Sequence, residues 1–396
     1  MSKSLHKRYI YFTMVSVIFF ISCIFGSSIG DFHFSTFEEV LQSFLNTWNL
    51  PEGSSNETLA VQAYALFFLY NRSPDPRLRE RAHETLNQIS SLLPRAVYEV
   101  LVGMEKWAYD GYPLSKEHFK KAVEMAPSDW WTHFQMMLYH YEVWKRTEAT
   151  EYRKLALESA EKVLSLNPML SYTYVVEMDV LSGIRYSDKE RLYQIYRIAA
   201  ERVPNSPVLW RESLKIFYEM GDYENAVDCA LRLAESGEMD EESRFMLAYS
   251  WWILGEGEKA YNTLMETDLN ALKAEWRSTA YDILGSIEED RGNLQKAIEF
   301  YSQAIRFDKN NVSAFKHLGL AYLKTNLERK DAYARYYLGI AQKLYPKDET
   351  VNEVLSELHK RIILRVVLTI ILPIVAVIIG LLLLVEKFMR PRERLR

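Results

Sequence analysis

Residues 278–311 read STAYDILGSIEEDRGNLQKAIEFYSQAIRFDKNN, and this stretch decides the fold. Its landmark residues, in order, are Tyr281, Leu284-Gly285, Gly292, Ala297, Tyr301 and Ala304. The small residues Gly285, Ala297 and Ala304 alternate with the large residues Tyr281 and Tyr301. Gly292 stands where a turn would separate the two helices. The stretch therefore predicts a helical hairpin.

The same pattern recurs along the chain. The well-formed copies span residues 96–129, 207–240, 278–311 and 312–348. The remaining copies, 241–277 among them, are degenerate and are placed mainly by spacing. Prolines that would end second helices stand at positions 94, 127, 168 and 204, separated by 33, 41 and 36 residues. We count about eight helical hairpins between residues 56 and 348.

The 34-residue period with these landmarks resembles the tetratricopeptide repeat (TPR), a helix–turn–helix unit. The resemblance covers about three quarters of the chain and implies an all-α fold, a superhelical TPR solenoid. In one repeat, Lys309 stands where the family usually has proline. TPR motifs specify a fold well and a function poorly.

Composition agrees with long helices and excludes several classes of protein. The chain of 396 residues has 53 aromatic residues but only 15 Gly and 12 Pro, too few turn formers for a many-stranded sandwich or barrel. Two cysteines, Cys23 and Cys229, exclude a disulfide framework and a cysteine zinc site. Residues 31–360 carry 38 basic and 51 acidic side chains, a balance that argues against nucleic-acid binding.

Catalytic and metal signatures are missing from the sequence. It contains no Gly-rich phosphate loop, GxSxG or HExxH motif. His133 and His140 lie two helical turns apart, about 10.5 Å along an axis, too far to chelate one metal between them. We therefore expect neither an enzyme nor a cofactor or metal site.

Two uncharged segments are long enough to cross a membrane. Residues 366–385, VVLTIILPIVAVIIGLLLLV, are almost wholly aliphatic, and Pro373 is tolerated in such a helix. Residues 9–30 fit an uncleaved anchor, a cleaved signal or a lipoprotein signal ending at Cys23. All three place the basic N-terminus in the cytoplasm and export the following domain. A basic tail, residues 386–396, would return to the cytoplasm.

The predicted plan follows from these segments. A signal or anchor at 1–30 precedes a neck helix and flexible joint at 31–55, where Pro51-Glu52-Gly53 breaks the helix. The repeat array at 56–348 is joined to the span at 366–385 by a connecting helix at 349–365. We expect a location in the cell membrane, with the array outside the cytoplasm and both termini inside if residues 9–30 are retained.

The resemblance also implies a binding surface. In TPR proteins, positions two, five, nine, twelve and thirteen of each repeat line the concave groove. Carried onto this chain, these positions give Met104, Trp107, Arg211, Lys215, Tyr218, Phe245, Tyr249, Trp252, Asp282, Ser286 and Glu289. An aromatic strip flanked by charges suits an extended peptide or a helix of a protein partner.

The expected function is a membrane-anchored scaffold that binds a protein or organises an envelope assembly through this groove. Two alternatives stay open. The chain could be an accessory subunit of a membrane enzyme for glycan or lipid transfer, or a tail-anchored organelle receptor with a cytoplasmic array. Membrane topology and captured partners distinguish the three.

Overall fold

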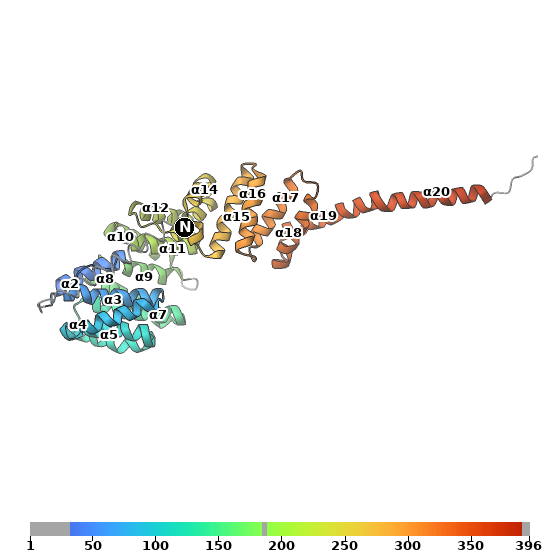
Figure 1. The fold of residues 1–396 in the computed structure, drawn as a ribbon. Helices are drawn as coiled ribbons and strands as arrows, with labels where there is room; N and C mark the ends of the chain where they lie inside the picture. The colour runs from blue at the N-terminus through green and yellow to red at the C-terminus, as the bar shows by residue number, and fades with distance from the viewer. Residues whose placement is uncertain (1–31, 184–187, 390–396) are drawn as a thin grey trace, which may run out of the picture. The chain divides into compact units, whose positions relative to one another are not determined.

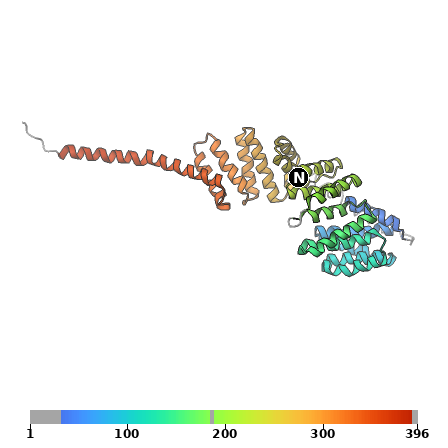
Figure 2. The same cartoon turned by 180° about the vertical axis from the view of Figure 1, so that it is seen from behind.

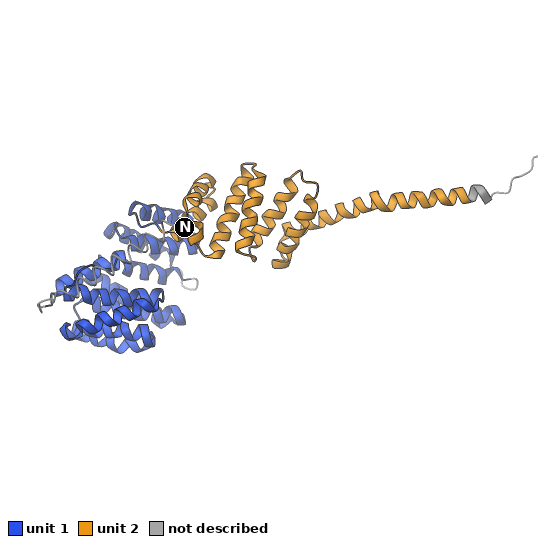
Figure 3. Cartoon of the chain, viewed as in Figure 1, with its two compact units in different colours: residues 1–239 blue, residues 240–396 orange. Residues whose placement is uncertain are grey.

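The computed structural model describes residues 32–183 and 188–389, with only the backbone for 386–389. The predicted segment 9–30, which includes Cys23, and residues 390–396 of the basic tail lie outside the described residues. Two compact units, residues 1–239 and 240–396, divide the chain (Figure 3). Within the described residues every regular element is helical (Figure 1, Figure 2).

The described residues of the first unit form one leading helix and five hairpins. The helices are α2 (Phe34–Thr47), α3 (Asn56–Arg72), α4 (Pro76–Ile89), α5 (Arg95–Asp110), α6 (Lys116–Met125), α7 (Trp130–Thr147), α8 (Thr150–Leu166), α9 (Ser171–Ser182), α10 (Lys189–Arg202), α11 (Pro207–Met220) and α12 (Tyr223–Glu235). Odd-numbered helices from α3 open a hairpin and even-numbered helices close it. Short 3₁₀ turns lie at Ser90–Leu92 and Tyr112–Ser115.

The second unit adds three hairpins and a long C-terminal helix. The helices are α13 (Glu241–Ile253), α14 (Gly257–Glu266), α15 (Ala274–Asp290), α16 (Leu294–Phe307), α17 (Val312–Lys324), α18 (Lys330–Leu344) and α19 (Glu349–Val366). A 3₁₀ turn at Leu269–Ala271 precedes α15. The described helices thus form eight hairpins between residues 56 and 344, which confirms the predicted all-α hairpin array.

Glycine, which has no side chain, sets the distance between the two helices of a hairpin. A Cβ added at Gly285 would lie 2.5 Å from a ring carbon of Tyr301, and one added at Gly319 would lie 2.7 Å from Cγ of Leu338. In both cases the first helix of the hairpin therefore packs directly on the large residue of the second. These glycines are the small landmark residues of the sequence pattern, and close helix approach is their physical reason.

Turn glycines and prolines end the helices where the pattern predicts. Gly221, Gly255 and Gly292 have φ of +73°, +81° and +80°, a backbone conformation that favours glycine over other residues. The helices α8 and α10 end two residues before Pro168 and Pro204. The carbonyl groups of both prolines accept hydrogen bonds from aromatic side chains of the next hairpin (Tyr174 Oη, 2.9 Å; Trp210 Nε1, 2.8 Å).

Helix α2 differs from the separate neck expected at residues 31–55. Its apolar face is buried against α3, α9 and α11. The side-chain amide of Asn46 hydrogen-bonds the backbone of Met169 and Ser171. The main-chain carbonyl of Asn46 accepts a hydrogen bond from Ser206 Oγ (2.8 Å). The expected joint is also held, because Gln62 Nε2 donates to the carbonyl groups of Pro51 and Gly53. The neck is thus part of the first unit's core.

The C-terminal helix extends the array's last hairpin. Val351, Leu355 and Leu358 of α19 are buried against α17 and α18. The helix continues through a π-helical turn, η4 (Val367–Ile371), into α20 (Leu372–Met389). This wider turn precedes Pro373, which has no N–H to continue the α-helical ladder. Aliphatic side chains along α20 are 42–63% exposed, so this part of the helix packs on none of the described residues.

The close contact at Gly285 gives a direct test. We expect Gly285→Ala to lower the free energy of unfolding of the second unit by about 1–3 kcal/mol, because Tyr301 or the helix must move. Gly339→Ala is the matched control, since Gly339 is also helical and has no neighbour within 4 Å of the added Cβ. It should be neutral or stabilising by up to about 1 kcal/mol. Chemical denaturation followed by circular dichroism measures both; equal effects would contradict the packing argument.

Candidate binding site

The inner face of the first unit contains a cavity of about 300 Å³. Every one of its five hairpins contributes its first helix, α3, α5, α7, α9 and α11. The lining residues include Phe68, Asn71, Arg72, Met104, Trp107, Leu138, Tyr141, Lys145, Tyr172, Asp179, Glu212, Lys215 and Glu219. The cavity is therefore a property of the array rather than of one repeat.

Arg72 links the first and last hairpins of this unit across the cavity. Its guanidinium pairs with Glu212 at 3.1 Å, although 140 residues separate the two in sequence. The same guanidinium lies over the rings of Trp48 (4.3 Å to the centroid) and Tyr172 (5.2 Å), and it donates to the Tyr172 hydroxyl. Cation–π contact and an ion pair thus fix one arginine at the centre of the unit.

The carboxyl group of Glu212 is held ionised. Burial opposes its ionisation, but Arg72 and Lys215 outweigh burial, so the pKa of Glu212 lies below its usual range. Lys215 Nζ donates to Glu212 at 2.8 Å. Burial raises the pKa of Tyr172 to about 12, so this phenol stays a neutral hydrogen-bonding group. The centre therefore has fixed charges that do not change near neutral pH.

A second polar group lies beside the first. Lys145 pairs with Asp179 at 3.1 Å and also donates to Tyr141 Oη, and Tyr141 donates to Asp179. Half of the Lys145 side chain is exposed. Asn71 adds a donor of a different kind, because its Nδ2 is buried and makes no hydrogen bond within the part of the chain that the structure describes. An unsatisfied buried donor costs free energy, and a ligand carbonyl would remove that cost.

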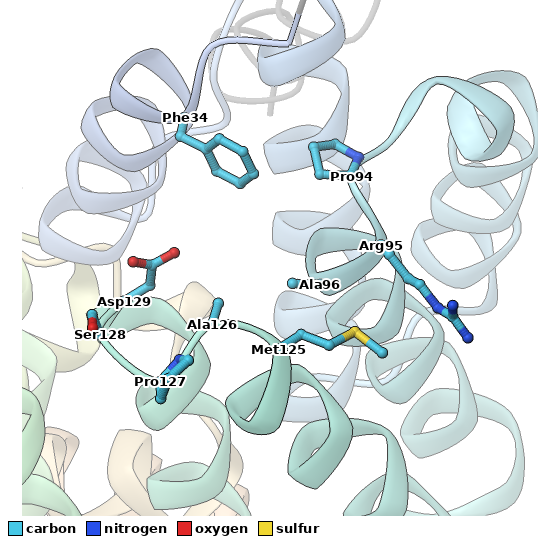
Figure 4. Close-up of a pocket in the computed structure, with 9 residues that line it drawn as sticks. All are labelled: Phe34, Pro94, Arg95, Ala96, Met125, Ala126, Pro127, Ser128 and Asp129. Carbon is cyan, nitrogen blue, oxygen red and sulfur yellow. The ribbon is translucent and has the colours of Figure 1, made fainter.

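A larger hollow of about 590 Å³ lies at one end of the same unit (Figure 4). Phe34 of α2 and the turns at 94–96 and 125–129 surround it. The side chain of Arg95 points away from the hollow, and most of its other lining residues are small or apolar (Figure 4). Helix ends and turns form this hollow without a converging set of polar groups, so we place the candidate site in the inner-face cavity.

Of the five groove residues predicted in the first unit, three line the cavity and two do not. Trp107 and Lys215 line the cavity, as does the neighbouring Met104. Arg211 instead donates to the carbonyl of Glu238 at 3.0 Å, and Tyr218 packs edge-on against Tyr223. Neither Arg211 nor Tyr218 lines the cavity.

In the second unit, three predicted residues gather along α15. Asp282 bonds Nδ1 of His317 at 2.9 Å, and Glu289 accepts from Tyr301 Oη at 2.8 Å and from Lys324 Nζ at 2.6 Å. Ser286 lies beside Tyr301 and partly offsets the rise in the pKa of that phenol caused by burial. These polar groups join α15 to α16 and α17, so their first role is to hold successive helices together.

The predicted aromatic strip of the second unit is corrected at one position. Phe245 is fully buried and stacks on Trp276 with centroids 4.9 Å apart, so it belongs to the core. Tyr249 and Trp252 are half-buried and pack edge-to-face at 5.9 Å. Position in the repeat predicts the face of a helix but does not tell how the next hairpin covers it.

Sequence reasoning missed most of the polar centre. Arg72, Asn71, Tyr141, Lys145, Tyr172 and Asp179 lie in hairpins too degenerate for the positional rule to be applied. The available signal was the density of aromatic and charged residues near the ends of these first helices. Their convergence depends on the curvature of the unit, which no local pattern shows. Among the described residues no group of three or more His, Cys, Asp or Glu side chains is arranged to hold a metal ion.

Comparisons with known proteins agree with this architecture. Residues 285–326 match the family model described as "TPR repeat". The fold is a tetratricopeptide-repeat solenoid. The TPR array resembles BBSome complex member BBS4 of Bos taurus, with 24% identity over 219 residues, 55% of this chain and 40% of that protein. The Mus musculus protein is 22% identical over 229 residues, 57% of this chain and 41% of its own. The chain thus spans about two fifths of these curated relatives.

Solved TPR structures also align with part of the array. One is YrrB, described as a TPR protein with an unusual peptide-binding site. Its sequence is 18% identical in the aligned part, the alignment covers 50% of this chain and 98% of YrrB, and the TM-score is 0.40. The C-terminal part of a TPR repeat-containing protein from Cytophaga hutchinsonii has 14% identity, covers 64% and 98%, and gives 0.47.

The His317–Asp282 pair generates a pH prediction. Burial opposes protonation of His317, but the hydrogen bond and charge of Asp282 outweigh burial and raise its pKa above 6.5. Because the folded-state pKa is raised, the pair stabilises the array below pH 6.5, and this stabilisation is lost as pH rises through the folded-state pKa. We expect Asp282→Asn to lower the pKa of His317, measured by NMR titration, because the hydrogen bond and the charge that raise this pKa are then lost. Ser313→Ala, which removes a longer 3.4 Å contact to the same ring, is the control. An unchanged pKa in Asp282→Asn would contradict the assignment.

Proposed function

We propose that the inner-face cavity of the first unit binds a segment of a protein partner, and that the chain is a membrane-anchored scaffold. One observation carries the proposal: five successive hairpins supply side chains to a single cavity, and its lining residue Asn71 has a buried Nδ2 donor that no described residue satisfies. Repeat arrays present extended surfaces in this way, and binding sites combine apolar walls with a few placed polar groups.

The cavity's chemistry suits a peptide main chain. Trp107, Leu138 and Ile216 supply apolar and aromatic surface, and Asn71 supplies a donor for a carbonyl group. Lys145 and Lys215 keep part of their side chains exposed even though both pair with carboxylates. Charges of both signs around an aromatic wall favour a partner segment with a mixed charge pattern over a strongly charged polymer. The partial likeness to BBS4, named as a member of a complex, also supports a role in an assembly.

The C-terminal helix supports the anchoring part of the proposal. Residues Glu349–Val385 form one continuous helical run of 37 residues. This run contains a stretch of 18 residues whose mean hydropathy is 3.2, and none of that stretch is buried. Length and composition therefore suit a membrane span. We propose the cell membrane as the location, with the array outside the cytoplasm. The basic residues at the N-terminus support this orientation, because positively charged flanks stay on the cytoplasmic side.

A photo-crosslinking experiment tests the binding site. A photoreactive amino acid at Glu219, on the cavity side of α11, should crosslink a protein partner in native membranes. The same group at Leu231, exposed on α12 of the same hairpin, is the matched control and should crosslink little. Mass spectrometry identifies the product; a common product at both positions, or none at Glu219, would count against the cavity.

A substitution tests the donor directly. Asn71→Ala removes the buried Nδ2 group without breaking a hydrogen bond of the free protein. We expect crosslinking from Glu219 to fall about tenfold, because a buried hydrogen bond is worth about 1–2 kcal/mol, while the unfolding midpoint stays within error. Full crosslinking in Asn71→Ala would show that the donor does not contact the partner.

Protease accessibility tests anchoring and orientation together. Protease is added to cells whose outer layers have been removed and whose cell membrane is intact. We expect digestion of residues 32–365 and survival of a fragment that contains the proposed membrane span. Alkaline carbonate should leave the chain in the membrane pellet. Protection of the array would instead support the tail-anchored receptor, and crosslinks to one membrane enzyme would support the accessory-subunit alternative.

A further inference from the structure

We propose that one edge of the second unit, residues 325–336, rests on the anionic headgroup surface of the bilayer. This headgroup edge consists of the α17–α18 connection and the first half of α18. The inference rests on the proposed anchor, because the bilayer is the surface that the C-terminal helix would enter. It concerns a part of the array remote in sequence from the inner-face cavity.

Two ion pairs place the headgroup edge next to the start of the span. Asp331 lies 3.9 Å from Nη1 of Arg361 and 3.6 Å from Nη2 of Arg365, and the uncharged run begins at residue 366. Packing of Leu338 with Leu355 and Leu358 fixes α18 along α19. The first turn of α18 therefore lies level with the last charged turn before the membrane.

The headgroup edge exposes the side chains that membrane interfaces favour. Leu327, Tyr333 and Tyr336 are 50%, 43% and 63% exposed. The Tyr333 ring stacks on Tyr322 with centroids 4.9 Å apart, and Tyr336 packs on Tyr337 at 5.0 Å. The rings are thus held at the surface by neighbours instead of turning inward. Tyrosine is enriched at the headgroup level, where its ring meets apolar chains and its hydroxyl stays wet.

The charge around this edge is opposite in sign to the net charge of the chain. The chain as a whole carries −5, whereas residues 324–336 and 360–366 together contain seven basic and two acidic side chains. Within the described part of the chain, no ion pair is found for Arg329 or Arg335, while Lys324 is paired with Glu289. Anionic headgroups would supply the missing partners, and each basic residue near such a surface strengthens binding roughly fivefold.

Helical spacing places Arg329 and the two tyrosines on one side, whereas Arg335, at i+6 from Arg329, projects about 120° from them. Arg329, Tyr333 and Tyr336 stand at i, i+4 and i+7 at the start of α18, so they project in similar directions. An exposed tyrosine pair with unpaired cations would also suit a protein surface. Continuity with the span decides for the bilayer, since the same helix that enters the membrane carries the arginines bound to Asp331.

The test uses the full chain in lipid nanodiscs. A fluorophore is attached through Leu327→Cys or, as the matched control, through Met265→Cys, an equally exposed position of α14 in the same unit. Cys23 is replaced by serine, and Cys229 is kept because its buried thiol does not react. Lipids with a nitroxide headgroup quench the fluorophore in discs of phosphatidylcholine alone or with phosphatidylglycerol.

We expect quenching at position 327 to exceed that at 265 by at least roughly twofold in the anionic discs, and to fall when Arg329 and Arg335 are changed to glutamate. Equal quenching at 327 and 265, in a chain that stays bound to the discs, would overturn this inference and leave the anchor standing. A chain that does not enter discs would refute the anchor and the inference with it. Shielding of position 327 from aqueous iodide without lipid quenching would show a protein on this edge and also overturn the inference.

Discussion

Direct contact between the two helices of a hairpin is the constraint on which the rest depends. Gly285 against Tyr301, Gly319 against Leu338 and Gly103 against Phe119 remove a side chain at the point of closest approach. The second helix can then cover the back of the first. The opposite face of each first helix is left for its neighbours and for the inner surface, and that is why the first unit's cavity is lined by first helices alone.

Curvature adds a second constraint in the first unit. Helix α2 packs on α3, α9 and α11 and so joins hairpins that are far apart in sequence. The ion pair of Arg72 with Glu212 likewise joins the first and last hairpins of this unit. Breaking such a partly buried pair by removing one partner leaves an uncompensated charge. The polar centre therefore serves two purposes: it fixes the ends of the curve, and it supplies the charged wall of the proposed site.

The second unit connects the array to the proposed anchor through one helix. Helix α19 is buried on one side by the last hairpin and continues through a π-helical turn into α20. No flexible linker separates the packed part from the apolar part among the described residues. The orientation of the last hairpin would therefore follow the span, and the tyrosines and arginines beside Asp331 lie where headgroups would meet them.

The sequence by itself determined the helices, their pairing and the apolar C-terminal run, because each depends on local spacing: glycine at turns, alanine and glycine at helix contacts, proline after second helices. The repeat positions also pointed to Met104, Trp107 and Lys215, which line the cavity of the first unit. Tertiary structure alone decided that the expected neck is core, that Phe245 is covered by Trp276, and that Arg72 meets Glu212. These outcomes depend on how each hairpin rotates on the next. That rotation accumulates over many repeats and leaves no local pattern in the chain.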